Sequence, residues 1–111
     1  MKHFKRKEFA CKCGCGLDAV DYQLAALMDS IREHYNAPVT ILSGNRCLSY
    51  NRKVGGAVNS QHLHSKAADF IVKGISPQEV QGHCKTLGYS VGCYAGFTHI
   101  DVRDGKVTWN G

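Results

Sequence analysis

The chain has 111 residues, a length typical of one domain with room for a modest hydrophobic core. Apolar residues make up 43% and charged residues 21%, as in ordinary globular proteins, and no apolar run reaches the ~18 residues of a membrane-spanning helix. The net charge of +5 favours polyanions in general, but no nucleic-acid-binding motif accompanies it, so nucleic acid is not an expected partner.

The first long element is an amphipathic helix predicted from Asp18 to Tyr35. Asp18 is a suitable N-cap, while Asn36 and Pro38 mark the end. The apolar residues recur at helical spacing and are expected to face the core: Val20, Leu24, Leu27, Met28 and Ile31.

The middle of the chain predicts two strands separated by a short helix and a long loop. Val39–Leu42 and Ala67–Val72 are rich in β-forming residues. Ser49–Val54 predicts one or two helical turns. The stretch Gly55–Ser65 is rich in Gly, Asn, Ser and His without periodicity, which is typical of a functional loop.

A second helix is predicted to begin after Ser76, which forms a capping box with Glu79, and Pro77 suits the first helical position. Three β-rich runs follow at residues 89–94, 97–103 and 106–109. The dipeptide Asp104-Gly105 predicts a hairpin between the last two runs. Helices packed on an antiparallel sheet predict an α+β fold.

Alternation in these strands brings polar side chains to one face. His99 and Asp101 share a face of their strand, while Ile100 lies on the other. Asp69 lies in an apolar run, where a carboxylate must be paired, hydrogen-bonded or bound to a metal. His62 lies on the loop just before that strand, within reach of Asp69. These residue types suit a catalytic zinc site, and the alternative is that Asp69 forms an ion pair with a lysine or an arginine. The other histidines, His3, His34 and His83, are interpreted as surface or hydrogen-bonded residues.

Several short motifs occur in a fixed order along the chain. They are Ser43-Gly44-Asn45-Arg46, Asn51, Val54-Gly55-Gly56, Asn59-Ser60-Gln61-His62, Ala67-Ala68-Asp69 and Gly96-Phe97-Thr98-His99-Ile100-Asp101. Together they resemble the zinc D-Ala-D-Ala carboxypeptidase family, and most closely its small bacterial and phage murein peptidases. The resemblance extends from about Phe4 to Trp109.

The resemblance implies one zinc peptidase domain over residues 1–111 with the hedgehog/DD-peptidase fold. It implies hydrolysis of peptide bonds in peptidoglycan, by a carboxypeptidase or an endopeptidase, in cell-wall lysis or remodelling. It implies Zn²⁺ as cofactor, with His62, Asp69 and His99 as metal ligands. Arg46 is implied to bind the substrate near the scissile bond or its carboxylate, and a surface ion pair is the alternative.

The chain departs from this family at two positions. Ser65 replaces a usual glycine, and Gly96 stands where the dipeptidase and carboxypeptidase branches place an acidic residue, three before the last histidine ligand. Asp101 is therefore the candidate catalytic base, followed by His64. Alternatively, Asp101 orients a ligand.

The expected partners are peptidoglycan stem peptides. The basic N-terminal end, which suits an anionic wall, has no apolar stretch of the kind found in secretory signals. The chain is therefore expected to be made in the cytoplasm and to act at the cell wall when released or carried there.

Two other classes of function remain open. One is a zinc-containing binding module of the same fold without catalysis, which the glycine at Gly96 allows. The other is a metal-stabilised interaction domain built on the cysteines: Cys11, Cys13, Cys15, Cys47, Cys84 and Cys93. Burial as reduced thiols, a metal site that joins one of the first three to Cys47, and disulfides are all compatible with this spacing.

Overall fold

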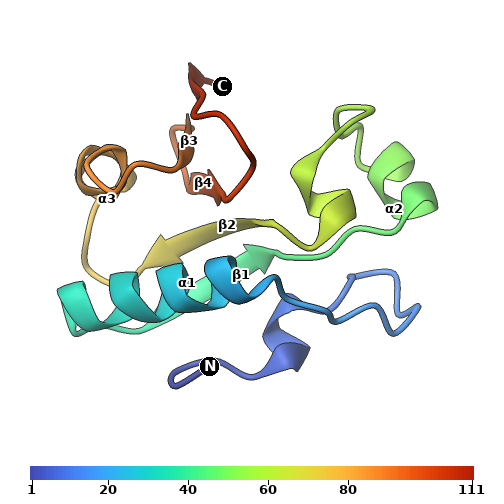
Figure 1. Ribbon diagram of the computed structural model, residues 1–111, viewed down its shortest axis with the longest axis horizontal. Helices are drawn as coiled ribbons and strands as arrows, with labels where there is room; N and C mark the ends of the chain where they lie inside the picture. Colours follow the sequence, from blue (N-terminus) through green and yellow to red (C-terminus); the bar gives the residue numbers. More distant parts are fainter.

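The computed structural model describes residues 1–111 and shows an α+β fold, as predicted (Figure 1). Its elements, in chain order, are η1 (Arg6–Phe9), α1 (Tyr22–Tyr35), β1 (Val39–Ser43), α2 (Leu48–Lys53), η2 (Gln61–His64), β2 (Ala67–Val72), α3 (Pro77–Lys85), β3 (Ser90–Cys93), β4 (Thr98–Asp101) and β5 (Thr108–Asn110). No helix combines the length and the apolar character needed to cross a bilayer.

The five strands form one sheet in the order β1-β2-β4-β3-β5. The first three pairings are antiparallel, whereas β5 runs parallel to β3, so the sheet is mixed. The predicted hairpin at Asp104-Gly105 is therefore wrong. Since β4 already has β2 on one edge and β3 on the other, it has no free edge for a hairpin partner. The chain instead passes beyond β3, where the Val91 amide donates to the Val107 carbonyl at 3.0 Å.

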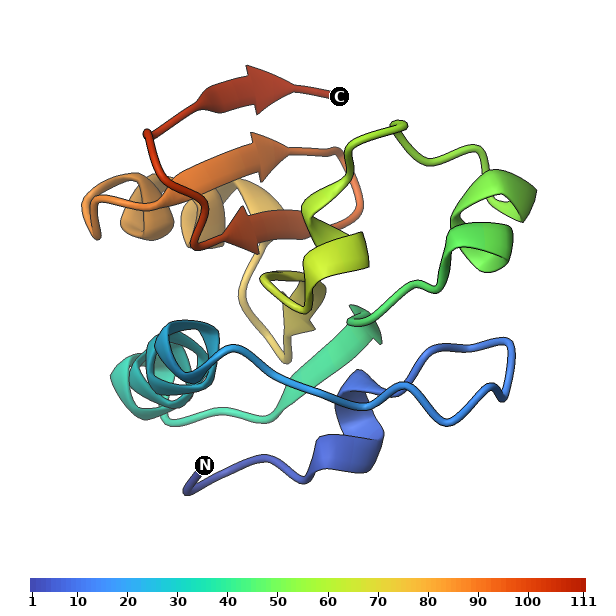
Figure 2. The same cartoon turned by 45° about the vertical axis from the view of Figure 1, so that its right-hand side comes forward.

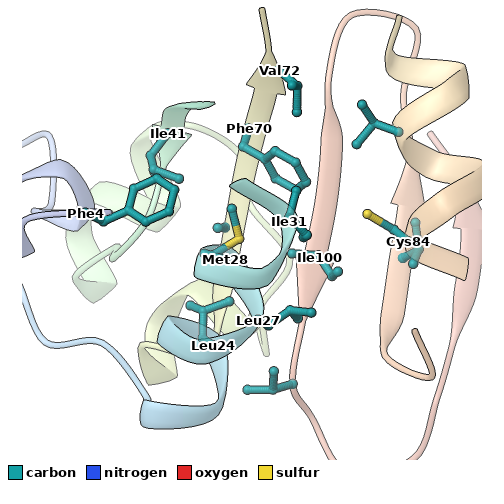
Figure 3. Close-up of a cluster of buried hydrophobic side chains, with 14 of the residues drawn as sticks. Phe4, Leu24, Leu27, Met28, Ile31, Ile41, Phe70, Val72, Cys84 and Ile100 are labelled. Atoms are coloured by element: carbon teal, nitrogen blue, oxygen red, sulfur yellow. The ribbon is translucent and has the colours of Figure 1, made fainter. Parts of the chain in front are cut away.

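Helices α1 and α3 cover one face of the sheet. Figure 3 shows Phe70 and Val72 of β2 between side chains of α1 and Cys84 of α3. Phe70, Met28, Cys84 and Ile100 are essentially inaccessible to solvent. Because side chains alternate across a strand, the residues between the core residues of β2 and β4 face the other side of the sheet. That side carries the polar site described below.

The first long helix begins later than predicted. α1 starts at Tyr22, and Asp21 is its N-cap, with a side chain that accepts a hydrogen bond from the Gln23 amide at 2.8 Å. Asp18, the predicted cap, instead lies 2.6 Å from the guanidinium of Arg6. The start of α3 follows the prediction, since Ser76 Oγ accepts from the backbone of this helix's first turn.

Candidate metal centre

Three buried side chains from three different elements meet on the open face of the sheet. His62 comes from η2, which Figure 2 shows beside β2 and β4, and Asp69 and His99 come from those strands. The antiparallel register pairs Asp69 directly with His99. One donor atom from each of the three lies within 4.8 Å of the others, and all three residues are at most 7% exposed. The structure thus brings together the three residues that the sequence motifs single out as metal ligands.

The two imidazoles present one ring nitrogen each to Asp69. His62 Nδ1 lies 2.6 Å from the Gly44 carbonyl, which can only accept, so this nitrogen carries the hydrogen. In the neutral ring its Nε2, which lies 3.3 Å from Asp69 Oδ2, then carries no hydrogen and has a lone pair available to a metal. His99 Nε2 contacts the carboxylate of Asp101 at 2.7 Å, while its Nδ1 lies 2.8 Å from Asp69 Oδ1. Metal-binding histidines are typically oriented in this way, with the second nitrogen bonded to a carbonyl or carboxylate.

The charged groups of the cluster shift the pKa values of one another. Burial by itself would raise the pKa of Asp69, but the imidazoles of His62 and His99 outweigh burial and hold that pKa below its ordinary value. Burial would likewise lower the pKa of His99, and its contacts with Asp101 and Asp69 raise it instead. Without a metal ion, Asp69 is therefore an ionised carboxylate, and its neighbours make His99 easier to protonate than a free imidazole.

Asp101 lies behind His99 rather than in the open space in front of the cluster. Its side chain is completely buried and accepts two hydrogen bonds from the Arg103 guanidinium, from Nε at 2.8 Å and from Nη2 at 2.7 Å, and a third from the Arg103 amide at 3.2 Å. Burial would raise the pKa of Asp101, but the bonds from Arg103 and His99 dominate and lower it to about 2. The other candidate base, His64, is exposed and lies outside the cavity residues, as does Gly96.

A cavity of about 460 Å³ opens over the three buried residues. Its only acidic side chain is Asp69, whereas Arg46 and Arg103 both contribute to its wall. Aromatic side chains form another part of the wall: Tyr94, Phe97 and Trp109. The cavity therefore combines a His/Asp/His group with cationic and aromatic surfaces, which suits a peptide that bears a carboxylate.

Arg46 is held by a network on the floor of this cavity. Its guanidinium reaches Ser43 Oγ at 3.2 Å, Asn51 Oδ1 at 3.3 Å and Asp69 Oδ2 at 3.4 Å. Gly56 packs against this network so closely that a Cβ there would collide with Asn51 and lie 2.8 Å from Arg46 Nη1. The motif residues Arg46, Asn51 and Gly56 are therefore one structural unit.

Among the cavity residues that the sequence motifs did not indicate, Arg103 and Trp109 make the most contacts relevant to the site. Arg103 anchors Asp101 and places its guanidinium carbon 5.2 Å from the ring centre of Trp109. Trp109 lies over Gly92, beside His99, with its Nε1 donating to the Tyr94 hydroxyl at 3.0 Å. The alternation His99, Asp101, Arg103 was a usable signal for Arg103. Trp109 had no local signal, because it depends on the parallel pairing of β5 with β3.

Comparison with known proteins agrees with this geometry. A search of curated proteins found no match. A model of the family described as Peptidase M15 matches residues 2–101, which include every cavity residue except Arg103 and Trp109. The match covers most of the chain, as did the motif resemblance to the zinc D-Ala-D-Ala carboxypeptidases, the same family. This chain therefore belongs to the Peptidase M15 family.

Proposed function

We propose that the chain is a zinc-dependent peptidase that hydrolyses peptide bonds in peptidoglycan. The observation that carries this proposal is the orientation of His62 and His99. Each imidazole bonds a protein acceptor through one nitrogen and turns the other toward Asp69. Two nitrogens and a carboxylate oxygen are the donor set of a catalytic zinc site that keeps a position open.

The residues present fit zinc in type as well as in number. The two imidazoles and one carboxylate leave one net negative charge when His99 is neutral, and the cavity leaves their outer side accessible. When bound there, zinc polarises a carbonyl oxygen and lowers the pKa of water.

The cationic wall of the cavity supports a peptide with an anionic group as substrate. Arg46, whose side chain is 15% exposed, is fixed by three neighbours and presents a preorganised guanidinium. A guanidinium binds a carboxylate through two parallel hydrogen bonds, so the C-terminus or a side-chain carboxylate of a peptidoglycan stem peptide is its proposed ligand. The aromatic wall formed by Tyr94, Phe97 and Trp109 bounds the other side and limits the access of water.

Asp101 acts in this proposal as a positioning residue for His99. Its buried carboxylate keeps the hydrogen on His99 Nε2, and Arg103 holds that carboxylate in place. Because Asp69 is the only acidic residue of the cavity, no carboxylate is assigned as general base.

The lack of a second acidic residue in the cavity favours a second candidate function. A cavity without a free carboxylate, combined with an intact His/Asp/His group, also suits a metal-loaded module that binds stem peptides without cleaving them. The two functions differ only in turnover.

The test combines metal analysis with product analysis. The zinc-loaded protein is incubated with purified peptidoglycan and with synthetic stem peptides that end in D-Ala-D-Ala, and products are identified by mass spectrometry. Release of the terminal D-alanine indicates a carboxypeptidase, and an internal cut indicates an endopeptidase. A chelator should abolish the activity, and added zinc should restore it.

His62→Ala and Asp69→Asn should remove both the activity and the metal of this site, since each removes one ligand. His3→Ala is the matched control, because His3 is an exposed histidine far from the site in the sequence. Zinc binding and peptide binding without any cleavage would support the binding module instead. If the wild type and His62→Ala have the same zinc content, His62 does not bind zinc, and both functions are contradicted.

A further inference from the structure

Four of the six cysteines converge at a second place in the molecule. Cys11, Cys13 and Cys15 lie on the loop after η1, and Cys47 precedes α2. All four sulfur atoms lie within 4.8 Å of one another. The sulfurs of Cys11 and Cys13 lie 3.4 Å apart, and those of Cys13 and Cys47 lie 3.5 Å apart.

These separations are those of ligands around a metal ion. Disulfide sulfurs are bonded at about 2.05 Å, well below the separations seen here. Four sulfurs at ~2.3 Å from a central zinc, at tetrahedral angles, are roughly 3.8 Å apart. The spread up to 4.8 Å brackets that value.

The loop is shaped to turn alternate residues toward one point. Gly14 and Gly16 adopt φ values of +83° and +89°, which a residue with a side chain rarely takes. The Cys11 amide donates to the Leu17 carbonyl at 2.8 Å and closes the loop on itself. The Cys47 amide points at Cys11 Sγ at 3.4 Å, the kind of N–H···S contact that supports a thiolate ligand.

We propose that Cys11, Cys13, Cys15 and Cys47 bind a second, structural zinc ion, distinct from the His/Asp/His centre. Four thiolates leave no open position, and closed sites of this kind stabilise structure rather than catalyse. The thiols lose their protons as the ion binds. Lys12 lies between Cys11 and Cys13 in the sequence, and its positive charge partly offsets the excess negative charge of a zinc ion bound by four thiolates.

This second ion would help to fix the segment from Gly44 to Cys47, which contributes to the His/Asp/His site. Cys47 directly follows Arg46, and Gly44 supplies the carbonyl that fixes His62. The same strand end is already tied to the N-terminal segment, because the Asn45 amide and side chain both donate to the Phe9 carbonyl at 2.9 Å. An ion bound by Cys11 and Cys47 would add a second connection between the N-terminal segment and the residues next to Arg46.

The inference can be tested independently of the peptidase proposal. Zinc content is measured for the wild type, for His62→Ala and for Cys13→Ser with Cys47→Ser. We expect two zinc ions per wild-type chain and about one in each variant, because the two ligand sets are separate. Cys93→Ser is the matched control, since Cys93 lies on β3 outside the cluster and should leave the zinc content unchanged.

Cobalt identifies the ligands directly. His62→Ala loaded with Co²⁺ should show thiolate-to-cobalt charge transfer and the intense visible bands of tetrahedral cobalt, and adding Cys13→Ser with Cys47→Ser should remove them. If the variant that combines all three substitutions fails to fold, X-ray absorption of zinc-loaded His62→Ala identifies the ligands instead. Four sulfurs are expected at ~2.3 Å from the zinc. Oxygen or nitrogen neighbours, iron in place of zinc, or disulfide formation detected by intact mass would each overturn the proposal.

Discussion

The carboxylate of Asp101 lies 2.7 Å from His99 Nε2, the ring nitrogen that does not contact Asp69. This carboxylate is fully buried, and its pKa of about 2 keeps it ionised throughout the neutral range. It therefore stabilises the ring form in which Nε2 carries the hydrogen and Nδ1 is available as a ligand. The same strand alternation that places both side chains on one face thus gives them different tasks.

Asp101→Asn tests this division. We expect zinc affinity at the His/Asp/His centre to fall by about 10- to 100-fold, because an amide orients the imidazole less strongly than a carboxylate. At saturating zinc, kcat should return close to the wild-type value. Zinc affinity is measured by competition with a chromophoric chelator, and kcat is measured across a zinc titration.

Asp104→Asn is the control for this substitution, because Asp104 is an exposed aspartate three residues further along. It should change neither quantity. A steep loss of kcat in Asp101→Asn with zinc affinity intact would show instead that Asp101 takes part in proton transfer.

The convergence of the His/Asp/His group could be predicted because the signals of its residues are local. His62, Asp69 and His99 belong to short motifs of fixed spacing, and strand alternation put Asp69 and His99 on defined faces. The buried strand β2 was predicted with its observed bounds, since an apolar run with turn residues on both sides has few alternatives.

The features that the sequence did not predict depend on contacts between segments far apart in the chain. The dipeptide at Asp104 indicates a hairpin, but only the sheet order shows that β4 has no free edge. The position of Trp109 over the site follows from that same order. A metal site joining the N-terminal cysteines to Cys47 was one of three alternatives left open by the sequence, because the approach of Cys47 depends on η1 packing against β1.

Ser65 offers a prediction about stability. It adopts a left-handed conformation at φ +61° and donates from Oγ to the buried Asn45 Oδ1 at 2.6 Å. Ser65→Ala and Ser65→Gly both leave that buried acceptor without its donor, but only Ser65→Gly relieves the backbone strain, so the two variants differ in strain alone. We expect Ser65→Gly to be more stable than Ser65→Ala by about 1–2 kcal/mol in urea unfolding.

Asn36 provides the comparison for Ser65. It is the other non-glycine residue with positive φ, at +46°, and its side chain is exposed. Asn36→Ala should therefore show the backbone cost alone, without a lost hydrogen bond. Equal stability of Ser65→Ala and Ser65→Gly would mean that the conformation at this position carries no strain.

The stacked pair His34 and His83 predicts a pH dependence of stability. Their rings lie 3.7 Å apart and nearly parallel, and burial, together with the charge of His34, lowers the pKa of His83 below 6.5. The unfolded chain therefore binds a proton at His83 more readily than the folded chain does, so this contribution to stability is lost as the pH falls through 6.5.

His83→Gln removes this titration. We expect the variant to lose less stability than the wild type on acidification, measured as urea unfolding at a series of pH values on both sides of 6.5. His64→Gln changes an exposed histidine outside the stack and is the control. Parallel pH profiles for wild type and His83→Gln would contradict the assigned role of the pair.

Gly56→Ala tests whether the Arg46 network positions the substrate. The added Cβ collides with Asn51 and lies 2.8 Å from Arg46 Nη1, so the guanidinium must move. Loss of one charge-assisted hydrogen bond predicts a fall in kcat/KM of about 10- to 100-fold on a stem peptide, mainly through KM, with zinc content unchanged. Gly96→Ala is the control, because a Cβ there meets no atom within 4 Å. If Gly56→Ala retains the wild-type kcat/KM while a crystal structure shows Arg46 displaced, Arg46 does not bind the substrate carboxylate, and Arg103 becomes the cation to which that role passes.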